Sequence, residues 1–178
     1  MNPGAVIATA LPTPVARAAP VALAAAPQGA PGCILDTNVV LDWLVFADPH
    51  GLAVGEAVTR GRLQWLSTPA MQAELVEVLA RLRSEPALQR WQHHEARALE
   101  MAAAWATPTE APAPLPPHRQ AHCSDPDDQI FIDLASARCV PWLFSRDRAV
   151  LKLARRMRPW GVTVLTPRHW CETQVSRT

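Results

Sequence analysis

The chain has 178 residues, of which 49% are hydrophobic, and its formal net charge is +1. This length suits one domain with appendages, and the hydrophobic fraction is sufficient for a core. The nearly balanced charge argues against binding of duplex nucleic acid by bulk electrostatics alone. No apolar stretch is long enough to span a membrane, and the four cysteines lack metal-ligand or redox spacing. A reducing cytoplasm is therefore the expected location.

Residues 1–32 form an Ala- and Pro-rich segment that carries one charged side chain, Arg17. Its prolines exclude a continuous helix, and it lacks the basic start and uninterrupted apolar core of a signal peptide. We expect a disordered tail that takes no part in the fold. A short tail is also expected at residues 173–178, which leaves a domain that spans residues 33–172.

Short apolar segments alternate with segments of helical periodicity from Cys33 onwards. The expected strands cover residues 33–36, 63–67, 142–145 and 162–165. The expected helices cover residues 38–46 (capped by Asn38), 52–60, 69–82, 86–106, 128–138, 148–158 and 167–172. Residues 107–117 include five prolines, so residues 107–121 are expected to form a loop. This alternation predicts a parallel sheet with helices on both faces.

Four acidic residues stand where such a fold delivers side chains to one place. Asp36 ends the first expected strand, and Asp147 lies just past the third, at the edge where parallel sheets bind ligands. Glu74 lies early in a helix at the margin of its apolar face, and Asp128 opens the helix after the Pro-rich loop. Gathered carboxylates repel one another, and oxygen ligands favour Mg²⁺ or Mn²⁺. Phosphodiester cleavage is the chemistry that most often uses such a site.

Each of these acids also has a simpler interpretation. Asp36 could only cap a helix, although Asn38 is available for that task. Glu74 could be solvated on its helix. Asp128 and Asp147 could do no more than complement the positive ends of two helices.

Polar and basic residues surround the acids in the sequence. Three polar residues are expected to orient the carboxylates or a bound water: Thr37, Asn38 and Ser145. Three basic residues could hold an RNA backbone, or could form a solvated helix face: Arg146, Arg148 and Lys152.

Five segments, taken in order, resemble the PIN-domain ribonucleases. They cover residues 33–40, which read Cys-Ile-Leu-Asp-Thr-Asn-Val-Val, and residues 68–79, 125–135, 143–151 and 161–167. The resemblance implies a PIN-like α/β/α sandwich whose central parallel sheet has four to five strands flanked by helices. It also implies a metal-dependent endoribonuclease that uses Mg²⁺ or Mn²⁺. The implied catalytic acids and metal ligands are Asp36, Glu74, Asp128 and Asp147.

Within this family, the chain most resembles the toxin components of bacterial toxin–antitoxin pairs. That resemblance implies an RNA substrate and a cognate antitoxin, and a homodimer is implied by the family alone. Two alternatives remain open at this point. An aspartyl phosphatase would need a second aspartate two positions after the first, where Asn38 stands. A catalytically weak PIN-like module would instead bind RNA or a protein partner without turnover.

Overall fold

The computed structural model describes residues 29–84 and 89–175, so the tail expected at residues 1–32 lies almost entirely outside the described residues. A five-stranded parallel sheet with the order β3-β2-β1-β4-β5 forms the centre. The strands are β1 (Gly32–Leu35), β2 (Gln64–Ser67), β3 (Thr107–Pro108), β4 (Trp142–Phe144) and β5 (Thr163–Leu165). The predicted parallel sheet is confirmed.

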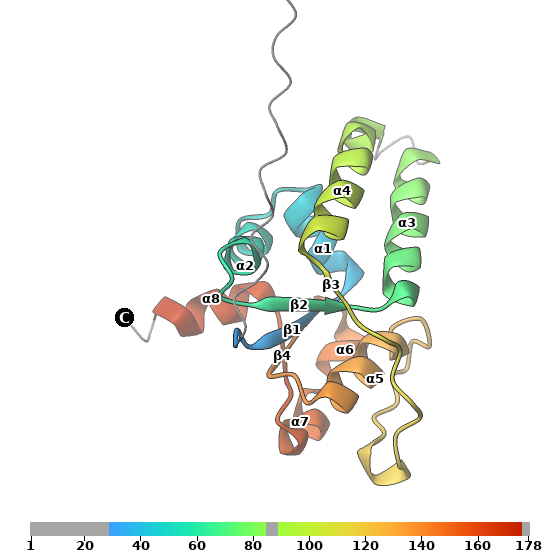
Figure 1. Ribbon diagram of the computed structural model, residues 1–178, viewed down its shortest axis with the longest axis vertical. Coiled ribbons are helices and arrows are strands. Elements are labelled where there is room, and N and C mark those ends of the chain that lie inside the picture. The colour runs from blue at the N-terminus through green and yellow to red at the C-terminus, as the bar shows by residue number, and fades with distance from the viewer. Residues whose placement is uncertain (1–28, 85–88, 176–178) are drawn as a thin grey trace, which may run out of the picture.

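Helices cover both faces of this sheet (Figure 1). The α-helices are α1 (Thr37–Leu44), α2 (Pro49–Thr59), α3 (Pro69–Ser84), α4 (Glu95–Trp105), α5 (Gln129–Arg138), α6 (Arg148–Leu151), α7 (Ala154–Met157) and α8 (Pro167–Val175). Short 3₁₀ helices are η1 (Gln89–His94), η2 (Pro117–Arg119) and η3 (Arg158–Trp160). In Figure 1, helices α1 to α4 lie above the sheet and α5 to α7 lie below it. The described helices include none with the length and apolar character needed to cross a membrane.

The alternation of side chains along the strands explains the three layers. In β1, Cys33 and Leu35 pack into the cluster formed with α1, α2 and α8, whereas Ile34 packs into the cluster around α5. In β4, Leu143 and Phe144 divide between the same two clusters. Successive strand residues point to opposite faces, so each short apolar strand supplies both cores. The predicted α/β/α sandwich is confirmed.

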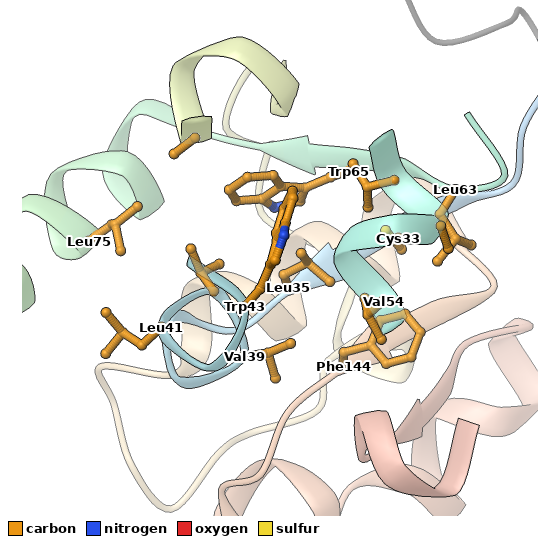
Figure 2. Close-up of a cluster of buried hydrophobic side chains, with 14 of the residues drawn as sticks. Cys33, Leu35, Val39, Leu41, Trp43, Val54, Leu63, Trp65, Leu75 and Phe144 are labelled. Atoms are coloured by element: carbon orange, nitrogen blue, oxygen red, sulfur yellow. The ribbon is translucent and has the colours of Figure 1, made fainter. Parts of the chain in front are cut away.

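Helices α1 and α2 approach each other closely because two glycines line their contact. The Trp43 ring from α1 meets Trp65 edge-on, with 5.9 Å between ring centroids (Figure 2). A Cβ atom on Gly55 would lie 2.1 Å from Nε1 of Trp43, and one on Gly51 would lie 2.8 Å from backbone and side-chain carbon atoms of Asp42. This packing fixes the position of α1, whose first turn follows directly from β1.

Three expected helical features are wrong. Helix α1 is capped by Asp36 rather than Asn38, because β1 ends at Leu35 and the chain turns at the next residue. The single helix expected at residues 148–158 is broken into α6, α7 and η3, with a tight turn in which the Leu153 N–H donates to the Val150 carbonyl at 3.0 Å. Of the helix expected at residues 86–106, residues 89–94 are 3₁₀ and the α-helix begins at Glu95.

Two further expectations need correction. The loop expected at residues 107–121 begins with β3, which pairs with β2 and is prolonged by a 2.9 Å bond from the Thr109 N–H to the Ser67 carbonyl. The apolar sequence context of Cys139 favours a small core residue. It is exposed instead, because it ends α5 in a left-handed conformation with φ of 49°.

Candidate active site

Asp36 lies at the carboxyl end of β1, where the sheet order changes direction. Its N–H donates to the Phe144 carbonyl of β4 at 3.0 Å, so the residue sits in the crevice between two strands whose connections leave in opposite directions. The residue is only 3% exposed. Its carboxylate accepts from the Asn38 amide at 2.7 Å and from the Ser145 hydroxyl. The carboxylate is therefore held in a fixed orientation.

The segment after β4 is tied to the same carboxylate. The buried Ser145 hydroxyl that donates to Asp36 also accepts from the Asp147 N–H at 2.9 Å. The Arg146 N–H donates to the Asn38 side-chain oxygen at 3.1 Å. Asn38 and Ser145, both expected to orient the acids, thus contact Asp36 directly and link it to Asp147.

Capping and site roles coincide at two of the four acids. Asp36 caps α1, and Asp147 caps α6 by accepting from the Ala149 N–H at 2.6 Å. Asp128 also stands at the cap position of α5, but its side chain makes no capping hydrogen bond. The capping interpretation therefore accounts for part of what Asp36 and Asp147 do, and it leaves the carboxylate of Asp128 unexplained.

Glu74 reaches the site from α3. Burial raises the pKa of Glu74, a hydrogen bond from Thr37 lowers it, and the charge of Asp36 raises it further. Glu74 is partly buried. Thr37 was expected to orient one of the acids. It does so for Glu74 on α3, and not for the adjacent Asp36.

Asp128 carries the largest perturbation in the acidic site. Burial raises its pKa to about 7, and the charges of Asp36, Asp147, Asp125 and Glu74 add to the rise. Burial also raises the pKa of Asp36, against the opposing hydrogen bonds from Ser145 and Asn38. The charges of Asp36, Asp147 and Glu74 therefore all act on Asp128, although the four acids come from separate parts of the chain. Carboxylates in such a field resist full ionisation unless a cation is present.

The acids are near one another but do not converge. Within residues 29–84 and 89–175, no three His, Cys, Asp or Glu side chains are grouped so that they could hold a metal ion. The donor set nevertheless fits a hard divalent cation, because it consists of carboxylate oxygens whose charges are otherwise unbalanced.

The Pro-rich loop is anchored beside Asp128. Gln129 donates from Nε2 to the Ala121 carbonyl at 2.8 Å and accepts from the Cys123 N–H at 2.9 Å. The same amide donates to Asp133 on the next turn of α5 at 2.8 Å. These bonds fix the start of α5, and with it the position from which Asp128 extends.

One residue of this region was not singled out from the sequence. Asp42, on α1, accepts from Nη1 of Arg146 through both carboxylate oxygens, at 2.5 Å each. Burial raises the pKa of Asp42 and the contact with Arg146 lowers it. A charged residue within the apolar run Val39–Leu44 was the signal that could have revealed it. Of the three basic residues expected to face RNA, Arg148 and Lys152 are exposed, and Arg146 is half-exposed but paired.

The fold and site together define an α/β protein with an acidic site at the switch point of a parallel sheet. A family model described as PIN domain matches residues 33–149. The chain belongs to the PIN domain family. PIN domains are generally nucleases, so membership supports hydrolytic action on nucleic acids.

A solved structure has the same fold. It is the crystal structure of VapBC2 from Rickettsia felis bound to a DNA fragment from their promoter, at 9% sequence identity and a TM-score of 0.50. The match covers 76% of this chain and 98% of that chain. At this identity the likeness concerns the fold alone. Comparison with curated protein sequences gives no match.

Proposed function

We propose that the protein is a metal-dependent endoribonuclease that cleaves phosphodiester bonds in RNA. Asp36, Glu74, Asp128 and Asp147 would hold one or two Mg²⁺ or Mn²⁺ ions. When bound, the cation supplies Lewis acidity that activates water and offsets charge on the scissile phosphate. The observation that carries the proposal is the raised pKa of Asp128, about 7, to which the charges of the other three acids contribute.

The polar neighbours hold the acids in place. Asn38 and Ser145 fix the carboxylate of Asp36, and Thr37 donates to Glu74. Preorganised side chains of this kind lower the cost of arranging a reaction site. Asp36 would therefore act as the most rigid member of the group.

The basic residues near Asp147 suit contacts with a phosphate backbone. Arg148 and Lys152 lie exposed on and after α6, whereas Arg146, whose side chain is 56% exposed, already pairs with Asp42. The net charge of +1 gives no broad basic surface, so contact with RNA would be local. Single-stranded or loop RNA is the expected substrate, because a flexible strand can be drawn over a shallow pocket.

A cleavage assay tests this function. A labelled single-stranded RNA should be cut internally in Mn²⁺ and left intact in EDTA. Asp36→Asn should abolish cleavage without unfolding the protein, because asparagine caps a helix as well as aspartate does. Glu77→Gln, an exposed change on α3, is the matched control and should cleave normally. RNA binding without cleavage in any metal would favour the PIN-like binding module instead.

We further propose that the protein is the toxin of a toxin–antitoxin pair. The fold likeness to VapBC2, a complex described with promoter DNA, supports the idea but concerns that protein. A small protein encoded next to this gene should co-purify with the chain and suppress its cleavage activity. Growth arrest on expression of the wild type, absent with Asp36→Asn, is the second expected result. We propose a cytoplasmic location, which agrees with the four free cysteines. A homodimer is a separate proposal.

A further inference from the structure

A cavity of about 310 Å³ lies next to the acidic site, between the loop after β4 and helices α1, α2 and α8. Its lining includes Asp42, Asp48, His50, Arg146, Thr166 and Arg168. Arg146 connects it with the site, because its neighbours Ser145 and Asp147 both belong to the network around Asp36. The volume is at the lower end of the range for ligand pockets, about 300–1,000 Å³. Arg146 therefore borders both the acidic site and the cavity.

Two arginines supply hydrogen-bond donors to the cavity. Arg146 uses Nη1 to contact Asp42, and its Nε and Nη2 have no hydrogen-bond partner among residues 29–84 and 89–175. Arg168 uses Nε to contact Glu172 at 3.0 Å. A guanidinium group presents its donors in a planar fork, which suits two adjacent acceptors on a flat ligand.

Asp48 supplies an acceptor. Its Oδ1 caps α2 by accepting from the N–H groups of His50 at 2.9 Å and Gly51 at 3.0 Å. Its Oδ2 has no hydrogen-bond partner in the described part of the chain. The cavity therefore holds paired donors and a carboxylate acceptor.

The charges favour a neutral ligand over a phosphate. Each arginine already has a carboxylate partner, Asp42 or Glu172. Asp48 adds a negative charge that a phosphate would have to approach. A nucleobase carries no charge and offers both donors and acceptors.

Guanine matches this arrangement. Its O6 and N7 are adjacent acceptors that arginine contacts in the commonest base-specific interaction, and its N2 amino group is a donor. Adenine presents an amino donor where guanine has O6, and would meet the donors of Arg146 unfavourably. We propose that the cavity binds a guanine base of single-stranded RNA beside the scissile bond, with Arg146 donating to O6 and N7 and Asp48 accepting from N1–H and N2–H. This inference rests on the proposed ribonuclease function.

Equilibrium binding tests the cavity without relying on catalysis. Three labelled RNA pentamers of uridine, with guanine, inosine or adenine at the centre, are titrated with the full chain in EDTA and followed by fluorescence anisotropy. The guanine pentamer should bind about tenfold more tightly than the adenine pentamer, in line with one good bidentate contact. Inosine, which lacks the N2 amino group, should fall between them. Equal affinities for guanine and adenine would overturn the proposal.

Asp48→Asn tests the role of the cavity without disturbing the fold. Asparagine caps a helix as well as aspartate does, so α2 is kept while the free carboxylate oxygen is lost. The preference for guanine should drop to about twofold or less if one of the two contacts is lost. Glu56→Gln, an exposed change on the same helix, should keep the full preference. A variant at Asp48 that binds guanine as selectively as the wild type contradicts the role of Asp48.

Cleavage assays on the same RNAs distinguish the two proposals. Cleavage in Mn²⁺ with no preference for guanine would refute the guanine site and leave the ribonuclease function standing. Guanine-selective binding with no cleavage in any metal would refute the ribonuclease function and support the guanine site.

Discussion

Nη1 of Arg146 lies 2.5 Å from both carboxylate oxygens of Asp42, whose side chain is only 4% exposed. The two residues are 104 positions apart in the chain. Their ion pair joins α1 to the loop after β4, which holds Ser145 and Asp147. Since the Arg146 N–H also donates to Asn38, this loop is attached to α1 at two points.

Asp42→Asn should therefore loosen the site as well as the fold. The change removes a buried charge partner and leaves a polar amide in its place, which costs about 1–3 kcal/mol in unfolding free energy. The half-exposed guanidinium can return to water, so the loss should stay below that of a fully buried pair, about 3–5 kcal/mol. Urea denaturation measures it.

The exposed pair between Arg168 and Glu172 supplies the control for this prediction. Glu172→Gln removes a surface ion pair of the i,i+4 type, and should leave the unfolding free energy almost unchanged because exposed pairs contribute little. Cleavage should fall with Asp42→Asn even at temperatures where it is fully folded. Equal stability of the two variants would show that the Asp42 pair contributes no more than a surface contact.

Gly55→Ala should destabilise the protein through Trp43. The added Cβ would lie 2.1 Å from the indole nitrogen of Trp43, a ring that is buried and packed against Trp65. Overpacking of this kind costs about 1–3 kcal/mol, which exceeds the gain of about 1 kcal/mol in helix propensity at its upper end. Leu52→Ala on the same helix, at a side chain 44% exposed, should change the unfolding free energy by about 0.5 kcal/mol or less. A stabilised Gly55→Ala protein would mean that Trp43 repacks freely.

The placement of the acids near one another could be predicted from the sequence because each one follows a local signal, whereas their catalytic and metal-binding roles stay predictions. Asp36 and Ser145 come directly after buried strands, and both sit at the carboxyl edge of the sheet. The partner of Asp42 was not predictable, because the contact with Arg146 depends on how α1 and the distant β4 loop meet in space. Local patterns carry no information on such a pairing.

Element boundaries were harder to predict than the elements themselves. The cap of α1 depends on where β1 ends. The strand was expected to end at residue 36 and ends at Leu35, so Asp36 and not Asn38 is the cap. Apolar patterning does not resolve a boundary to one residue. Strand β3 has only two residues, Thr107 and Pro108, so it shows no alternation that could mark it. It forms because the chain leaving α4 runs along the free edge of β2.

Asp147→Asn should weaken cleavage less than Asp128→Asn. Asp147 has one oxygen engaged as the cap of α6, and asparagine keeps that oxygen. Asp128 makes no capping bond, and its pKa is raised by the charges around it, so its carboxylate is available for the cation. Losing an outer contact typically costs about 10–100-fold in metal affinity or activity, and losing Asp128 should cost more.

Single-turnover cleavage of one RNA at saturating Mn²⁺ makes this comparison, because weakened metal affinity is then not mistaken for lost chemistry. Both variants should keep their far-ultraviolet circular dichroism spectra. Equal losses of cleavage, or a larger loss with Asp147→Asn, would mean that Asp147 contacts the cation directly and that Asp128 makes the outer contact.

Protons and a divalent cation should compete for Asp128. Without metal, its folded pKa is about 7, against an ordinary value of 3.8. The folded carboxyl thus holds its proton more tightly than the unfolded one, and the folded chain carries more protons between these two values. The resulting stability is fully present below the ordinary value and is lost as the pH rises through the folded pKa.

Unfolding free energies in EDTA, measured at several pH values for the wild type and Asp128→Asn, reveal this linkage. Asparagine mimics the protonated carboxyl, so the wild type should lose stability relative to the variant as the pH rises towards 7. Above that pH, Mn²⁺ should make the wild type more stable than the variant. A ligand at 100 times its dissociation constant stabilises the folded state by about 2.7 kcal/mol. The variant, with one ligand fewer, should gain less. A difference between the two proteins that stays constant with pH, and that Mn²⁺ does not alter, would show that Asp128 neither feels the other acids nor binds a cation.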